Sequence, residues 1–214
     1  MKKIVFFVLV ALFIAGNCFA TNSKEIKNLS KEKKPALSAS VKKVQSFIDK
    51  VKSVDKNSKK SAMPKKTVVF NEQDINEYLN YLVQEKNKKL EVDNVKVKFV
   101  GNDILKAEAN VIFDLAEVFK QEEDSLIGKI LKKASNFKNS FDVQVRIFSN
   151  KGKYMVVVQS LKINGIKLPD TLVQVFVKHI GKKQKPPIDM TKFVDLPYGV
   201  QKIEISSGII TIKL

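Results

Sequence analysis

The alternation of apolar and polar residues over several long stretches is the feature of this sequence that most constrains its fold. Residues 95–100 and 105–113 alternate on either side of a Gly101-Asn102 turn. Residues 141–149 and 154–163 alternate around a second turn at 150–153, and short strands close the chain from residue 193. Successive side chains of a strand point to opposite faces, so each of these strands has one apolar face that must be covered. The pattern predicts antiparallel hairpins with one buried face.

The alternation also predicts which side chains point inward. They are Val95, Val97, Phe99, Leu105, Ala107, Ala109, Val111, Phe113, Phe141, Val143, Val145, Ile147, Met155, Val157, Leu161 and Ile163. Two alanines in the middle of one inward face indicate that something bulky approaches the sheet there. A helix or a ligand would both fit that space.

The stretch from Asp170 to Ile180 predicts a helix that needs cover on most of its surface. It follows Pro169, we expect it to end at Gly181, and apolar residues occupy nearly every side of it. Valines are poor helix formers, so burial must hold this helix, and a strongly curved sheet that partly wraps it would supply that burial. Only the stripe of Thr171, Gln174 and Lys178 is expected to face water.

Two more helical stretches complete the predicted domain. Asn71 is expected to cap a helix that runs to about Glu85, and Asp114 precedes a broken helical stretch over 115–135. The predicted fold class is α+β, with a curved antiparallel sheet that wraps one or two helices. We place this domain at residues 67–214.

The first twenty residues have the pattern of a secretory signal peptide. A short basic start precedes eleven apolar residues at 4–14, and small residues follow up to Ala20. The apolar stretch is shorter than the ~20 residues of a spanning helix. We therefore expect cleavage after Ala20 and an exported chain, periplasmic or associated with the cell envelope. Cys18 leaves a lipid-anchored N-terminus open as an alternative.

Residues 21–66 form a basic leader, which holds 14 Lys and 4 acidic residues. The formal net charge of the whole chain is +17, and residues 67–214 contribute little of it, with 23 Lys or Arg against 18 acidic residues. Within the leader, residues 36–54 predict a basic amphipathic helix whose apolar face carries Leu37, Val41, Val44, Ile48 and Val51. Such a helix either lies on a membrane or packs on the domain.

The charge and its distribution favour an anionic surface as partner and disfavour nucleic acid. Arg146 is the single arginine, and the basic segment lacks the Tyr and Trp side chains on which bases stack. Lysines suit an anionic membrane surface or a cell-envelope polymer, which the leader would contact. A solvated spacer remains the alternative for this segment.

Residue patterns typical of enzymes are missing from the sequence. The chain has one histidine, His179, and no nucleophile elbow, phosphate-binding loop or dinucleotide motif. The acidic run at 122–124 is typical of a solvated helix junction. We therefore predict no catalytic residue, no metal ligand and no cofactor, and a protein that is not an enzyme.

Four segments carry a resemblance to a known group of proteins. They read VVFNEQDINEYLNYLV, VKVKFVGNDILKAEANVIFDL, LKINGIKLPDTLVQVFV and FVDLPYGVQKIEISSGIITI. They resemble exported bacterial proteins of unassigned function that look like single-domain relatives of the tubular lipid-binding superfamily. The resemblance covers roughly residues 67–214. It implies a curved antiparallel sheet that wraps a helix around an apolar channel, and it assigns no site residues.

The sequence thus predicts an exported, envelope-associated binding protein that holds a lipid or another apolar ligand between the sheet and the helix from Asp170. The candidate lining residues are Ala107, Ala109, Val111, Phe113, Met155, Val157, Leu172 and Phe176. The alternative is a structural or interaction protein of the cell envelope, not an enzyme, with a solid core and the basic leader as a tether.

Overall fold

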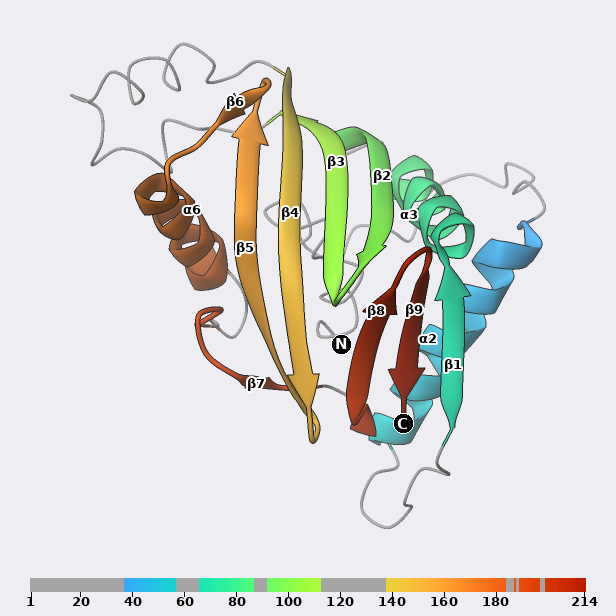
Figure 1. The fold of residues 1–214 in the computed structure, drawn as a ribbon. Coiled ribbons are helices and arrows are strands. Elements are labelled where there is room, and N and C mark those ends of the chain that lie inside the picture. Colours follow the sequence, from blue (N-terminus) through green and yellow to red (C-terminus); the bar gives the residue numbers. More distant parts are fainter. Residues whose placement is uncertain are drawn as a thin grey trace.

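The fold is α+β, with three helices and antiparallel strands among the described residues (Figure 1). The computed structural model describes residues 37–56, 66–86, 92–112, 138–183, 187, 189–196 and 199–214. The predicted signal peptide, the helical stretch over 115–135 and Phe113 lie outside these residues. The division of the chain at residue 66 stays a prediction.

The strands form two hydrogen-bonded sheets, where the sequence predicted one. The larger sheet has the order β2-β3-β4-β5-β6, and β7 also pairs with β5; the smaller has the order β1-β9-β8. The strands are β1 (Thr67–Asn71), β2 (Val92–Gly101), β3 (Ile104–Ile112), β4 (Lys138–Asn150), β5 (Lys153–Ile163), β6 (Ile166–Lys167), β7 (Val194–Asp195), β8 (Lys202–Ser206) and β9 (Ile209–Lys213). The described pairings are all antiparallel, which confirms the predicted hairpins.

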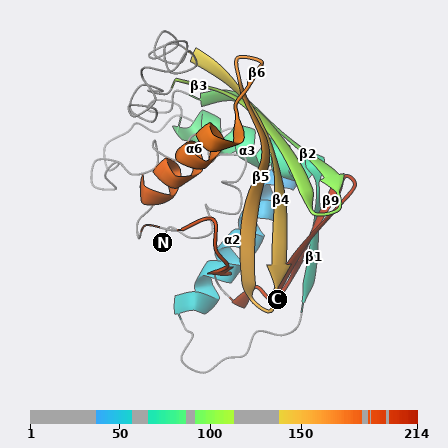
Figure 2. The same cartoon turned by 60° about the vertical axis from the view of Figure 1, so that its left-hand side comes forward.

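The described helices lie on one side of the sheets. They are α2 (Ala39–Lys56), α3 (Glu72–Lys86) and α6 (Asp170–Lys183). In Figure 2 they lie to the left of the strands, and in Figure 1 the opposite face of the six-stranded sheet is turned to the reader. We call the helix side of this sheet its inner face and the other side its outer face.

The inner face of the six-stranded sheet holds most of the core, as the alternation predicted. The predicted inward residues of β2, of β4 and of β3 up to Val111 are at most 7% exposed. The residues that alternate with them along these strands point to the outer face and are mainly Lys, Glu, Asn and Gln. The phase of these three strands is therefore confirmed.

The prediction was wrong for the first half of β5. Tyr154 and Val156 are buried, whereas Met155 is half-buried and Val157 is 40% exposed. The cause is a β-bulge: Val145 pairs with Val158 and Gln144 with Ser160, so Gln159 is an extra residue. A bulge shifts the side-chain phase by one position, and alternation counted back from Leu161 therefore gave the wrong face.

Helix α6 lies against the inner face and has the orientation that its sequence predicted. Thr171, Gln174 and Lys178 are exposed, while Leu172 and Phe176 are buried. The helix runs to Lys183, so the prediction that Gly181 ends it was wrong. A glycine in the last turn costs only about 1 kcal/mol and does not by itself end a helix. That a curved sheet wraps this helix stays a prediction.

Helix α3 caps the edge strand of the six-stranded sheet with its side chains. Asn71 Oδ1 accepts a hydrogen bond from the Asp74 N–H at 2.7 Å, which confirms the predicted cap. Asn76 accepts from the Val97 N–H at 2.6 Å and donates to its carbonyl at 2.8 Å, and Glu72 accepts from the Phe99 N–H. These bonds replace those of a further strand and so protect β2 from pairing with another chain.

The turn between β2 and β3 joins the two sheets. Asp103, in a left-handed conformation with φ of 60°, donates its N–H to the Ile205 carbonyl at 3.0 Å. Its carboxylate accepts from the Ile205 N–H at 3.0 Å, and its carbonyl accepts from the Ile147 N–H at 2.8 Å. One residue thus bonds to strands of both sheets and fixes their relative position.

Helix α2 packs on the domain with the apolar face that the sequence predicted. Val41, Val44, Ile48 and Val51 are buried, and the rings of Phe47 and Phe70 meet edge to face at 5.4 Å. Lys43 Nζ lies 2.5 Å from Asp74 Oδ2 on α3. Of the two alternatives for this helix, the structure therefore has the one that packs on the domain.

Candidate functional site

The structure divides seven of the eight predicted lining residues between two faces. Ala107, Ala109, Val111, Leu172 and Phe176 are buried on the inner side. Met155 and Val157 lie on the outer face because of the bulge in β5. Phe113 lies outside the described residues. A single ligand between sheet and helix therefore cannot contact both groups.

The inner group is in contact with protein. The Phe176 ring of α6 packs against the Phe141 ring of β4, with centroids 6.1 Å apart. Ala109 is the cross-strand neighbour of Phe141, and Ala107 is that of Val143. Phe141, on the strand next to the two alanines, thus meets a helix, one of the two occupants, helix or ligand, that the alanines left open.

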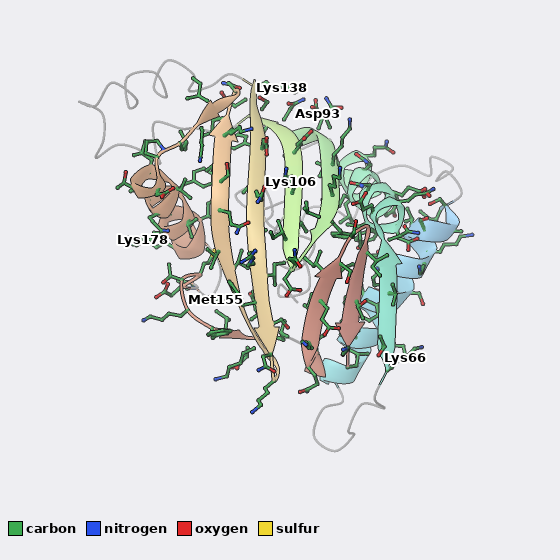
Figure 3. All side chains as sticks on the ribbon, in the orientation of Figure 1. Lys66, Asp93, Lys106, Lys138, Met155 and Lys178 are labelled. Carbon is green, nitrogen blue, oxygen red and sulfur yellow. The ribbon has the colours of Figure 1, made fainter. Side chains whose placement is uncertain are left out.

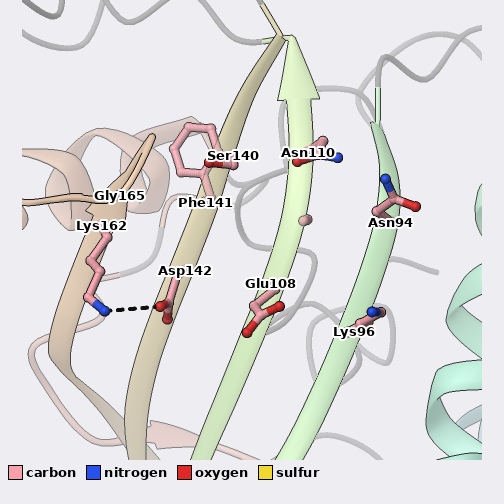
Figure 4. Close-up of a pocket in the computed structure, with 10 residues that line it drawn as sticks. Asn94, Lys96, Glu108, Asn110, Ser140, Phe141, Asp142, Lys162 and Gly165 are labelled. Atoms are coloured by element: carbon pink, nitrogen blue, oxygen red, sulfur yellow. Dashed lines mark ion pairs between the residues drawn. The ribbon is translucent and has the colours of Figure 1, made fainter.

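A depression of about 510 Å³ lies on the outer face, at the β6 end of the six-stranded sheet (Figure 4). Its lining is mostly polar and comes from β2, β3, β4, β5 and the turn after β5. The lining residues are Asn94, Lys96, Glu108, Ala109, Asn110, Ser140, Phe141, Asp142, Lys162 and Gly165. The side chains of Ala109 and Phe141 point inward, so polar groups dominate the surface that a ligand would meet.

Charges in this depression are balanced along one cross-strand row. Lys96 lies opposite Glu108, and Asp142 lies between Glu108 and Lys162 in register. Lys162 Nζ and Asp142 Oδ2 form an ion pair at 3.4 Å (Figure 4). Neighbouring carboxylates are the residue types of glycoside hydrolases, but here lysines stand at both ends of the row.

The next rows toward the β4–β5 turn are cationic. Lys98 lies directly opposite Lys106, and Arg146 follows on β4 opposite Ile104. In Figure 3, Lys106 stands near the middle of the outer face. Within the described part of the chain, none of these three cations has an acidic partner within ion-pair distance. We call Lys98, Lys106 and Arg146 the cationic group.

Arg146 also has an unsatisfied donor. Its Nε is enclosed by neighbouring atoms and has no hydrogen-bond acceptor among the described residues. A buried donor without a partner costs about 1–3 kcal/mol, so most such groups in proteins are satisfied. The cross-strand neighbours of this single arginine on the outer face are the apolar side chains of Ile104 and Val157.

The sequence analysis missed the cationic group, although a signal was present. Alternation alone places Lys98 and Lys106 on the outward face of one hairpin, and the irregularity between Phe99 and Gly101 sets the register in which they lie opposite each other. Alternation predicts the inward residues directly, whereas the excess of lysines draws attention to the leader. Lys98 and Lys106 are exposed lysines of the domain itself.

The described residues contain neither a metal-binding cluster nor a helix that could cross a membrane. Among them, no three or more His, Cys, Asp or Glu side chains gather closely enough to hold a metal ion. No described helix is both long and apolar enough to cross a membrane. His179 is half-buried in the last turns of α6.

Comparisons with known proteins do not assign a family. No protein-family model, no curated protein and no solved structure matches this chain. The geometry of the outer face is therefore the main basis for a functional proposal.

Proposed function

We propose that this chain is an exported, envelope-associated binding protein that binds an anionic partner through the outer face of its six-stranded sheet. The supporting observation is the cationic group, three cations without acidic partners on neighbouring strands. Export rests on the signal-peptide pattern of residues 1–20. The basic leader adds to the attraction for an anionic surface.

The cationic group is unfavourable for the free protein. Like charges directly opposite each other on two strands destabilise a sheet by a few tenths of a kcal/mol. An anion placed between Lys98 and Lys106 removes that repulsion and gains two charge-assisted contacts. Binding of an anionic partner therefore offsets a repulsion that remains in the free protein.

The leader helix is a weaker candidate for the main contact. Its apolar face is buried on the domain, which leaves its lysines without apolar residues beside them. One of these lysines, Lys43, also has a partner in Asp74. We assign the leader a general electrostatic role and the outer face the specific one.

A binding assay with a matched control tests this proposal. The full chain is expressed, purified from the envelope fraction and mixed with vesicles of phosphatidylcholine and phosphatidylglycerol, or with dextran sulfate as an anionic polymer. We expect binding to at least one of them, weakened by salt because exposed charges are screened. The Lys98→Gln/Lys106→Gln variant should bind more weakly than Lys178→Gln/Lys182→Gln, which removes the same charge from the exposed side of α6. Equal loss in both variants would contradict the proposed site.

A second candidate function is the one that the sequence favoured, an apolar ligand between the sheet and α6. The observation in its favour is the pair Ala107 and Ala109, two small side chains in the middle of the inner face of β3. Ala107→Phe separates the two readings. In a filled core the larger side chain should cost about 1–3 kcal/mol of unfolding free energy. In a ligand channel it should instead displace a co-purifying lipid, which native mass spectrometry detects, with little change in stability.

A further inference from the structure

Exposed apolar side chains form a band across the outer face, on both sides of Arg146 and between the two lysines of the cationic group and the β4–β5 turn. Val100 is 42% exposed, Phe148 40%, Val157 40% and Phe193 54%, and Ile104 and Met155 are half-buried beside them. Phe148 pairs with Met155, and Arg146 lies between Ile104 and Val157 in register. We call these six residues the apolar band. It crosses β2, β3, β4 and β5 and reaches the residue before β7.

Lysines border the apolar band on both sides. Lys98 and Lys106 lie on its β6 side, and Lys151 and Lys153 lie at the β4–β5 turn beyond it. All four are exposed, and none has an ion pair within the described part of the chain. Figure 3 shows Lys106 and Met155 on the same side of the sheet. Apolar side chains thus occupy the middle of the surface, and lysines stand at its margins, where Asp195 is the register neighbour of Lys153.

We propose that the apolar band docks this protein on an anionic lipid bilayer. Phe148, Phe193 and Val157 enter the boundary between headgroups and acyl chains, and the bordering lysines contact lipid phosphates. This inference rests on the proposed function and names the partner of the same face. Burial of apolar area and attraction to anionic lipid are the two terms that hold proteins at a membrane surface.

The combination favours a bilayer over the other anionic partners. A soluble anionic polymer would satisfy the lysines but would leave the apolar band in water. A bilayer takes up both, because its phosphates lie above its acyl chains. Contiguous exposed apolar patches on a soluble domain commonly mark such contacts. The buried apolar face of α2 leaves this helix without a comparable surface.

A tryptophan reporter tests which surface enters the bilayer. The chain contains no tryptophan, so Phe148→Trp introduces a single one into the apolar band. On mixing with vesicles of equal phosphatidylcholine and phosphatidylglycerol, we expect its emission to shift to shorter wavelength and to be quenched by brominated acyl chains. Lys178→Trp, on the exposed side of α6, is the control and should show neither effect. A shift at position 178 without one at 148 would overturn the inference.

Vesicle flotation measures the contribution of the apolar band to affinity. Phe148→Ser/Val157→Ser should bind more than about tenfold more weakly, because two partly exposed apolar side chains no longer enter the bilayer. Ile166→Ser/Val69→Ser removes two comparably exposed side chains outside the apolar band and should change binding by less than about twofold. Thermal melting followed by circular dichroism verifies that both variants are folded.

The outcomes separate this inference from the proposed function. Vesicle binding that the apolar-band variant leaves intact overturns the inference and keeps the anionic partner. Binding to dextran sulfate but not to vesicles, or capture of an acidic protein with the vesicles left unbound, does the same. No binding to vesicles, polymer or protein removes both proposals.

Discussion

Helix α2 and the outer face of the six-stranded sheet have the same chemistry and different surroundings. Both place a row of apolar side chains beside lysines. On α2 the apolar row is buried against the domain, whereas on the sheet Val100, Phe148 and Val157 are exposed. The comparison shows that an amphipathic pattern identifies a surface that needs a partner but does not say whether the chain itself supplies that partner.

The partners of α2 explain the difference. Lys43 pairs with Asp74, Ser38 donates to Glu77, and Gln45 accepts from the Tyr78 hydroxyl. Each polar contact lies at the margin of the buried apolar row and fixes the orientation of the helix. The cationic group of the sheet has no such contacts among the described residues. We infer that its complement belongs to another molecule.

The largest expected effect compares one buried and one exposed valine. Val44 on α2 is 2% exposed, and Val44→Asp should lower the free energy of unfolding by about 4 kcal/mol, because it buries an unpaired carboxylate. Val157→Asp on the sheet should change it by less than about 1 kcal/mol. Urea unfolding followed by circular dichroism measures both. A smaller loss for Val44→Asp than for Val157→Asp would mean that α2 does not hold to the domain in solution.

The second prediction concerns the ion pair that attaches α2. Burial by itself raises the pKa of Asp74, but the hydrogen bonds from Lys43 and Asn71 and the charge of Lys43 outweigh it, and the pKa lies below its ordinary value of 3.8. A depressed pKa means that the carboxylate stabilises the fold at neutral pH and that this contribution is lost as the pH falls through the folded pKa. Asp74→Asn should therefore cost about 1–2 kcal/mol at neutral pH.

The pH dependence is the control for that prediction. As the pH falls below 3.8 the unfolded chain takes up the proton first and the folded carboxylate follows at its lower pKa, so the stability difference between wild type and Asp74→Asn should shrink. Asparagine keeps an oxygen that accepts from the Asn71 N–H, so the comparison isolates the charge. Unfolding free energies of the two proteins are measured in parallel across this range. A difference that stays constant with pH would show that the ion pair contributes nothing.

Sequence patterns predicted the parts of the fold that depend on local geometry. The inward residues of β2, β3 and β4 follow from a strict period of two, and the Asn71 cap follows from residue type and position. The first half of β5 failed because Val156, Val157 and Val158 are consecutive valines, which fit either phase. Only the pairing with β4 shows that Gln159 is the bulged residue.

The candidate site was less accessible to sequence reasoning for a physical reason. The predicted lining residues are apolar, and apolar residues are found both in a solid core and around a ligand channel. The destination of the apolar face of α2 depended on contacts more than thirty residues away in sequence, such as that between Lys43 and Asp74, 31 positions apart. Lys98 and Lys106 become a pair only through the hairpin register.

The smallest expected effect should distinguish a functional lysine from a structural one. Lys98→Gln removes the repulsion with Lys106, so the free energy of unfolding should rise by about 0.5 kcal/mol while binding to anionic vesicles weakens about fivefold. Lys96→Gln, two residues away on the same strand, is the matched control. Because Lys96 faces Glu108, this variant should lose a few tenths of a kcal/mol instead.

A double-mutant cycle makes the comparison quantitative. If Lys98 and Lys106 repel each other, neutralising either one removes the repulsion, so the stability gain of Lys98→Gln/Lys106→Gln should be less than the sum of the single gains. Vesicle affinity should instead fall further with the second change, because each lysine contacts lipid independently. Strictly additive stabilities would show that the two lysines do not interact, and the charge pattern would then have no cost that binding relieves. On a surface that binds an external partner, neutralising a lysine should raise stability and lower affinity. On α2, which packs against the domain, neutralising a lysine should change stability and affinity in the same direction.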